Sequence, residues 1–175
     1  MGLGKLKFQN IIMKKLLVIT ALVISAAGLQ AEEHGFQASL TPDIAIYPKT
    51  AEISGLSLNI WGENPQHGAA LGFVNGSTGD SSGFSWAFFY NYADTYTGVE
   101  WSIVNYSKTS FTGWQAGMVN YSEGKFNGLQ MGIVNYAENL HGVQIGFANI
   151  AMNNGWFNEF PDKLATGFPF FNWSF

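Results

Sequence analysis

The sequence predicts an all-β fold, and three observations lead to it. From Gly55 on, glycine recurs in one frame at intervals of 13 to 15 residues. After each of these glycines, large apolar side chains alternate with small or polar ones, which is the two-residue period of a β-strand. Between these segments lie Asn, Ser, Asp, Gly and Thr, the residues that turns prefer. We therefore expect one strand and one turn per repeat of about 15 residues, and no helix after residue 31.

Ten segments follow this frame. Their opening glycines are Gly35, Gly55, Gly68, Gly83, Gly98, Gly113, Gly128, Gly142, Gly155 and Gly167. In a typical repeat the first, third and fifth residues after the glycine are large and apolar, as in Val99, Trp101 and Ile103. The second and fourth are small or polar in most repeats. Ten segments give ten strands, and eight remain if the two segments that Pro42 and Pro161 interrupt are left out.

The segment 1–31 is expected to be a signal peptide with an N-terminal extension, removed on export. Lys14 and Lys15 precede an uncharged apolar run from Leu16 to Leu29, and Ala31 ends a stretch suited to signal-peptidase cleavage. The run is too short to cross a membrane comfortably as a helix. Residues 32–175 then form a single exported domain.

The composition excludes several classes of function. The chain contains no Arg and no Cys, so a disulfide framework, a thiolate metal site and a cysteine nucleophile are ruled out. Beyond residue 31, four Lys stand against twelve Asp and Glu, a net charge of −8. Because so acidic a domain has no basic surface for a phosphate backbone, we expect no nucleic-acid partner.

Two architectures fit strands that have one apolar face and one small, polar face. In an outer-membrane β-barrel the apolar face is turned to lipid and the polar face fills the lumen. In a soluble β-solenoid the apolar face is turned inward. We expect a small antiparallel up-and-down outer-membrane barrel of eight to ten strands, with membrane lipid as its partner and the outer membrane of a Gram-negative-type envelope as its location. A β-solenoid is the alternative.

Strand length and aromatic residues favour the barrel. Strands of nine or ten residues match a tilted passage through the apolar layer of a membrane. Four consecutive strands end in Asn-Tyr, and in an antiparallel barrel these tyrosines would alternate between two rims as an aromatic girdle. They are Tyr92, Tyr106, Tyr121 and Tyr136. Glycine in the middle of a strand, as at Gly117 and Gly132, suits a narrow lumen.

The C-terminus carries alternating aromatic residues, Phe171, Trp173 and Phe175. This pattern resembles the C-terminal signature of bacterial outer-membrane β-barrels. The resemblance implies that the last strand is recognised by the machinery that assembles such barrels. Counted from Gly167, these residues fall on the small, polar side of the repeat, so a bulge or a change of frame at Pro169 is needed.

The repeats are also similar to the units of a bacterial surface-repeat family, of the form G-V-Q-[IM]-G-[LIF]-[VA]-N. The units Gly128–Asn135 and Gly142–Asn149 show the likeness most clearly, and it extends from Gly55 to Ile150. The resemblance implies a location at the cell surface or in the envelope, and no defined activity.

One acidic residue, Glu100, lies in the middle of a strand on the small, polar face. A carboxyl group buried in a lumen needs hydrogen-bonding partners, and serine and glutamine side chains on the same face can provide them. We expect a polar network of Glu100, Ser85, Ser102, Gln115, Gln130 and Gln144.

The sequence favours a non-catalytic protein with a structural, adhesive or envelope-integrity role. The three histidines, His34, His67 and His141, are dispersed and lie at strand starts or in turns. No G-x-S-x-G or H-E-x-x-H motif occurs, and we expect no catalytic residue, cofactor or metal. Two alternatives remain. One is a soluble or surface-attached β-solenoid that acts as a binding module, and the other is a lipid-modifying barrel enzyme with a serine and a histidine near one rim.

Overall fold

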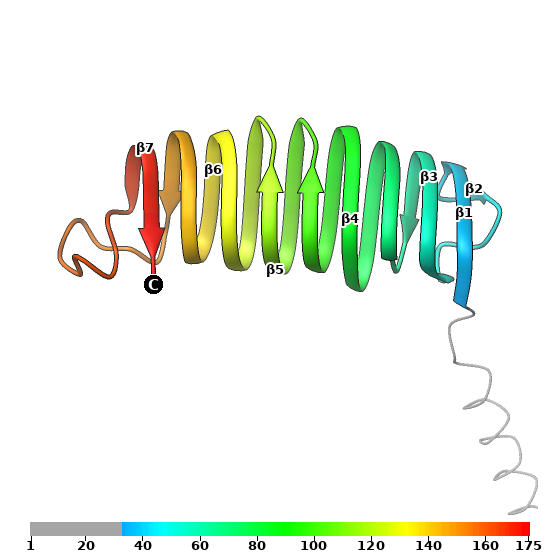
Figure 1. Ribbon diagram of the computed structural model, residues 1–175, viewed down its shortest axis with the longest axis horizontal. Coiled ribbons are helices and arrows are strands. Elements are labelled where there is room, and N and C mark those ends of the chain that lie inside the picture. Colours follow the sequence, from blue (N-terminus) through cyan, green and yellow to red (C-terminus); the bar gives the residue numbers. More distant parts are fainter. Residues whose placement is uncertain (1–32) are drawn as a thin grey trace, which may run out of the picture. The chain divides into compact units, whose positions relative to one another are not determined.

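A computed structural model describes residues 33–175, and the expected signal peptide, 1–31, lies outside the described residues. The described chain winds into a β-solenoid of about seven turns, seen from the side in Figure 1. We call each turn of the solenoid a coil. The strands are β1 (Glu33–Thr41), β2 (Ile44–Ala45), β3 (Glu52–Asn64), β4 (His67–Trp101), β5 (Val104–Ala116), β6 (Val119–Ala151) and β7 (Gly167–Ser174). The expectation of an all-β fold is confirmed.

The prediction of an antiparallel barrel is wrong, and the alternative, a β-solenoid, describes the fold. Neighbouring coils pair in parallel with one repeat beside the next, so that Glu100 lies beside Gln115 and Asn105 beside Asn120. The pairs β1–β3, β3–β4, β4–β5 and β5–β6 are all parallel, and β1–β2 and β6–β7 at the two ends are antiparallel. Alternation with a period of two fits both directions of pairing, so it could not decide between the two architectures.

The repeat glycines stack on one another along the solenoid. Six of them have positive φ angles between 121° and 151°, namely Gly68, Gly83, Gly98, Gly113, Gly128 and Gly142. A Cβ atom at Gly98 or Gly128 would collide with the carbonyl oxygen of the glycine one coil earlier. Both the backbone conformation and the close approach of the coils therefore require glycine here, which explains its period in the sequence.

Small and polar side chains form most of the interior. Two lines of amide and carboxyl side chains are at most 1% exposed: Glu100, Gln115, Gln130 and Gln144, and Asn91, Asn105, Asn120, Asn135 and Asn149. The large apolar residues that alternate with them are turned outward. This is the reverse of the arrangement expected for a solenoid, in which the apolar face would be turned inward.

Hydrogen bonds between coils satisfy most of these buried amides, with Gln144 Oε1 as an exception. Asn120 shows the pattern, because its Oδ1 accepts a hydrogen bond from Asn105 Nδ2 at 2.8 Å and its Nδ2 donates to Asn135 Oδ1 at 2.8 Å. Identical side chains in successive coils come within reach of one another because paired strands lie about 4.8 Å apart. A buried amide left without a partner would cost about 1–3 kcal/mol, so the ladder makes a polar interior tolerable.

A narrow apolar core lies at another point of the coil, thirteen residues after the repeat glycine. Tyr96, Phe111 and Phe126 stack there, with ring centroids 5.7 Å and 5.4 Å apart, and Leu140 continues the line. These positions fall in the segments that the sequence predicts as turns. The apolar core was therefore missed, although its period of 14 or 15 residues is visible in the sequence.

The segment between β2 and β3 closes the N-terminal end of the interior. Gln37 Nε2 donates to the carbonyl oxygen of Tyr47 at 2.9 Å, and Gln37 Oε1 accepts from the Tyr47 N–H at 3.1 Å. Asn64 Nδ2 donates to the carbonyl oxygens of Pro48 and Ala51, both at 3.0 Å. This segment is thus a cap that forms hydrogen bonds with the polar side chains inside the first coil. Solenoids require such caps at their ends.

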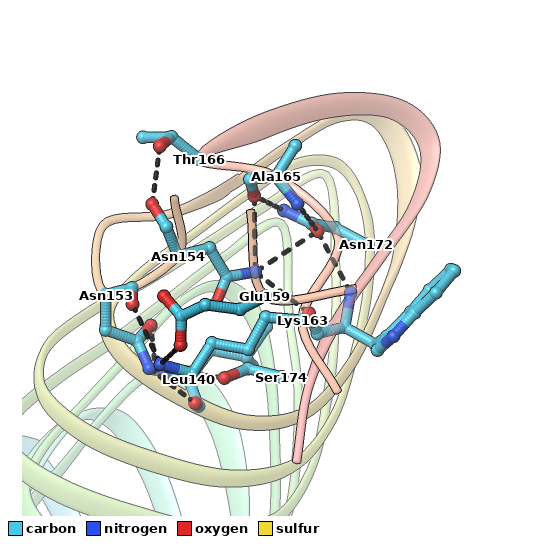
Figure 2. Close-up of polar contacts among 10 residues, drawn as sticks. Leu140, Asn153, Asn154, Glu159, Lys163, Ala165, Thr166, Asn172 and Ser174 are labelled. Atoms are coloured by element: carbon cyan, nitrogen blue, oxygen red, sulfur yellow. Dashed lines mark hydrogen bonds and ion pairs between the residues drawn. The ribbon is translucent and has the colours of Figure 1, made fainter. Parts of the chain in front are cut away.

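The segment between β6 and β7 closes the C-terminal end, as Figure 2 shows. Asn153 Nδ2 donates to the Leu140 carbonyl oxygen at 2.9 Å, and Thr166 Oγ1 donates to the Asn154 carbonyl oxygen at 2.6 Å. Lys163 and Glu159 form an ion pair at 2.7 Å on the same segment. These contacts hold the loop against the last coil.

The reversal of direction at β7 accounts for the C-terminal aromatic residues. Trp173 pairs with Val143 and Phe171 pairs with Ile145, so both lie beside outward-facing residues. Asn172, between them, pairs with Gln144 and is fully buried. The antiparallel pairing of β7 therefore supplies the change of frame that the sequence requires. The strand that pairs with β7 also has a register shift, between Gly146 and Asn149.

Candidate functional site

Large apolar side chains cover one outer side of the solenoid. They are the third and fifth residues after the repeat glycines, which fall on the same two lines in successive coils. We call them the apolar face: Leu58, Ile60, Leu71, Phe73, Trp86, Phe88, Trp101, Ile103, Met118, Met131, Ile133, Ile145 and Phe147. Apart from the half-buried Leu71, each is between 38% and 71% exposed.

The apolar face is too extensive to be an ordinary part of a soluble surface. Its side chains come from seven consecutive coils, which at about 4.8 Å per coil gives a length of roughly 30 Å. It contains no charged residue. Single exposed apolar residues are normal, but a continuous apolar patch of this kind marks a binding surface.

Two hollows follow one another on this face. The first has a volume of about 480 Å³ and lies between Leu58, Ile60, Leu71, Phe73, Trp86 and Phe88. The second has a volume of about 370 Å³ and continues from Trp86 and Phe88 to Trp101, Ile103 and Met118. The two hollows meet at Trp86 and Phe88, and we call the pair the trough; Gly72, Ala87, Ser102 and Gly117 also line it.

The predicted girdle tyrosines lie beside the apolar face instead of alternating between two rims. Tyr106, Tyr121 and Tyr136 stack in one line along the solenoid, with ring centroids 6.0 Å and 4.6 Å apart. Tyr92 stands apart from this stack, donating from its hydroxyl to Glu63 Oε2 at 2.7 Å and accepting from Trp61 Nε1 at 3.2 Å. Burial is the main cause that raises the pKa of Tyr92 above its usual value.

The predicted polar network lies inside the solenoid, in two parts. Gln115 Nε2 donates to Glu100 Oε2 at 3.1 Å, and Gln130 and Gln144 extend this ladder with bonds of 3.1 Å and 2.8 Å. The two serines form their hydrogen bonds with the asparagine line instead. Ser85 Oγ donates to Asn91 Oδ1 and Ser102 Oγ donates to Asn105 Oδ1, both at 2.9 Å.

Within its ladder, Glu100 is hydrogen-bonded to a glutamine, Gln115, and not to a cationic side chain. Burial raises the pKa of its carboxyl group to about 8, and the hydrogen bond from Gln115 opposes this effect. The side chain is 1% exposed, so the carboxyl group faces the interior and not a substrate-accessible surface. We therefore treat Glu100 as part of the fold.

Stacking of the coils brings His67 into contact with a serine and an acidic residue, a combination that was not predicted from the sequence. His67 Nδ1 lies 2.9 Å from Ser82 Oγ, and His67 Nε2 lies 3.5 Å from Glu52 Oε1. The signal was the spacing, because the three residues are 15 apart and occupy the same place in successive coils. The side chains of His67 and Glu52 are 39% and 37% exposed, so the contact is open to water.

The other two histidines are placed separately. His34 stacks on Tyr47 with ring centroids 3.5 Å apart, and His141 is exposed. Within residues 33–175, no group of three or more His, Asp or Glu is placed to hold a metal ion, and no helix is long and apolar enough to span a membrane. The chain matches no protein-family model, no curated protein and no solved structure.

Proposed function

We propose that this chain is an exported, non-catalytic binding module that lies on a lipid surface through its apolar face, with the outer membrane as its location. The observation that carries the proposal is the exposure of the apolar face. Twelve of its thirteen large apolar side chains are exposed by 38% or more, on consecutive coils.

The order of residues around the coil supports a lipid surface as the partner. Val104, Val119 and Val134 follow the apolar face, and Tyr106, Tyr121 and Tyr136 come two residues later. The next outward positions hold Lys108, Glu123 and Glu138, which are all exposed. Tyrosine between an apolar and a charged zone is the arrangement found where proteins meet the membrane–water interface.

The charge of the domain constrains the kind of lipid. With a net charge of −8 beyond residue 31, the protein gains no attraction from anionic headgroups. Binding then depends on apolar area, at about 25 cal/mol for each Å² removed from water. We expect the protein to bind zwitterionic vesicles at least as well as anionic ones, and to stay bound at high salt.

Flotation with phosphatidylcholine vesicles tests the proposal, using protein exported by a Gram-negative host and freed of detergent. The variant Phe88→Asn/Ile103→Asn/Ile133→Asn removes three side chains of the apolar face that are 49%, 38% and 50% exposed. We expect it to reduce the vesicle-bound fraction at least about tenfold, since each such side chain is worth about 1.5 kcal/mol or more when buried.

A matched control is the variant Met152→Asn/Trp156→Asn/Phe160→Asn, whose side chains are 52%, 62% and 63% exposed and belong to the segment between β6 and β7 instead of the apolar face. It should float like the unmodified protein. Equal flotation of both variants would overturn the proposal. The unmodified protein could instead form a dimer that does not bind vesicles. If the Phe88→Asn/Ile103→Asn/Ile133→Asn variant were then a monomer, the apolar face would be assigned to contact with a second copy of the chain.

A further inference from the structure

The trough on the apolar face has the shape of a channel for one chain-like molecule. Its two walls are the third and fifth residues after the repeat glycines, represented by Trp86 and Phe88 where the two hollows meet. Trp86 and Phe88 are two residues apart on β4, so the two walls lie close together at this point. Along the solenoid the trough crosses five coils, from Leu58 to Met118, a distance of about 19 Å.

These dimensions favour an extended hydrocarbon chain over a bulky or flat ligand. With carbon–carbon bonds of about 1.5 Å in a zigzag, roughly fifteen bonds span the length of the trough. The combined hollows also fall within the ordinary size range of ligand sites, about 300–1,000 Å³. A planar or branched ligand would have to stand above the walls, where it would lose most of its contacts.

The charge distribution restricts the headgroup. The residues that line the two hollows include no Lys, Asp or Glu, so nothing in the trough pairs with an ionised head. The domain as a whole is acidic, which disfavours a carboxylate or phosphate close to it. An uncharged head that stays in water at one end of the trough meets both conditions.

We propose that the trough binds one molecule of an uncharged single-chain lipid, such as a monoacylglycerol, with its acyl chain lying along the solenoid axis. This inference rests on the proposed function, since the same face meets the lipid surface from which such a molecule is taken. It differs from surface docking because it requires a fixed stoichiometry and a defined place on the apolar face.

Isothermal titration calorimetry with monopalmitoylglycerol below its aggregation concentration tests the proposal on the exported protein. We expect saturable binding of one molecule per chain, and a negative heat-capacity change because apolar surface is buried. Ionised palmitate should bind more weakly than monopalmitoylglycerol, and free glycerol should not bind. Heat that never saturates, or equal binding of palmitate, would overturn the assignment.

Two matched variants locate the site. Trp86→Ala/Phe88→Ala opens both walls where the hollows meet, and Met131→Ala/Ile133→Ala removes apolar side chains on the same face beyond the trough. All four residues are between 38% and 50% exposed, so neither variant removes core packing, and circular dichroism verifies the fold. We expect the first variant to weaken monopalmitoylglycerol binding more than about tenfold and the second to leave it within about twofold.

The two proposals fail in different ways. If both variants lose flotation to a similar degree but bind monopalmitoylglycerol equally, the lipid surface stands and the trough is refuted. If monopalmitoylglycerol binds in the trough while the unmodified protein does not float, the trough stands and docking is refuted. Should Trp86→Ala/Phe88→Ala disturb the fold, Ile60→Asp provides a second variant, because Ile60 is 54% exposed on the trough wall.

Discussion

The coils from Gly98 to Ala151 and the coils from Glu33 to Thr97 follow the same repeat but are filled differently. In the C-terminal coils, glutamine or glutamate occupies the second position after the glycine and asparagine the seventh. In the N-terminal coils the second position after Gly55, Gly68 and Gly83 holds the smaller Ser57, Ala70 and Ser85, whereas the segment that opens with Gly35 has a glutamine there, Gln37, against the N-terminal cap. The same backbone path is therefore compatible with a full amide ladder and with a depleted one.

The first coil shows how the depleted half compensates. Gly62 stands where later coils have asparagine, and Asn59, three residues earlier, packs against Gly62 and donates to Asn75 Oδ1 at 2.9 Å. The repair is incomplete, because Ser39 Oγ and Asn59 Oδ1 are buried without a hydrogen-bond partner, although Gln144 Oε1 at the end of the regular ladder lacks one as well. We infer that the regular C-terminal coils contribute more stability per coil, while most of the trough lies over the less regular half.

The comparison predicts its largest pH-independent effect at Asn120, in the middle of the regular ladder. Asn120→Ala removes bonds to Asn105, Asn135 and the Met131 carbonyl oxygen, and leaves buried polar atoms without partners on both sides. We expect the free energy of unfolding to fall by about 3 kcal/mol. Asn59→Ala removes a hydrogen bond between coils, to Asn75, and should cost about 1 kcal/mol. Urea unfolding followed by circular dichroism measures both.

Equal losses in the two variants would contradict the division between the halves. An unfolding curve with two steps for the Asn59→Ala variant would support the division between the halves, because the N-terminal coils would then unfold before the C-terminal coils. Such stepwise loss is expected of solenoids, in which each coil contacts its neighbours alone.

A pH-dependent effect is expected at Glu100, where the glutamine ladder meets the depleted half. Burial raises the pKa of this carboxyl group from 4.5 to about 8 in the folded protein. Below pH 4.5 it is protonated in both states, and its folded environment imposes no penalty of ionisation. Between pH 4.5 and 8 the unfolded chain releases the proton and the folded chain keeps it, so stability declines as the pH rises.

Glu100→Gln removes this titration and extends the ladder of Gln115, Gln130 and Gln144 by one rung. The melting temperatures of the variant and the unmodified protein should be similar at pH 4.5, and the variant should become progressively more stable than the unmodified protein up to about pH 8. A difference that stays constant with pH would show that Glu100 is not buried as described.

The regular half was also the more predictable from the sequence. The glycine frame and the alternation were predicted correctly there, because each repeat glycine serves one steric need that recurs in every coil. The predicted division into one strand and one turn per repeat was wrong, since β6 continues from Val119 to Ala151. The direction of pairing could not be predicted, since alternation is the same in parallel and antiparallel strands. The apolar core of Phe111 and Phe126 was missed because one apolar residue between polar neighbours looks like part of a turn.

The candidate site could be predicted only in part. The apolar residues were recognised as one face, but a solenoid was expected to turn that face inward. The apolar face is turned outward because the stacked side chains of Asn105, Asn120 and Asn135 occupy the interior. Their amides form hydrogen bonds with one another between coils, in place of hydrogen bonds with water. The trough and the contact between His67 and Ser82 depend on which coils are neighbours, so they became visible once the parallel register was known.

The smallest effect is expected at His67, in the depleted half. A serine, a histidine and an acid in contact are also what nucleophilic catalysis uses, so this position tests the non-catalytic assignment. If the contact merely links coils at the surface, His67→Ala should cost less than about 1 kcal/mol of stability and leave vesicle flotation unchanged. Hydrolysis of a p-nitrophenyl acyl ester by the unmodified protein, lost in both His67→Ala and Ser82→Ala but kept in the exposed-histidine control His141→Ala, would instead identify an enzyme. We expect all four proteins to leave the ester intact, because an imidazole and a carboxylate that are 39% and 37% exposed are solvated by water and gain little from each other's charge.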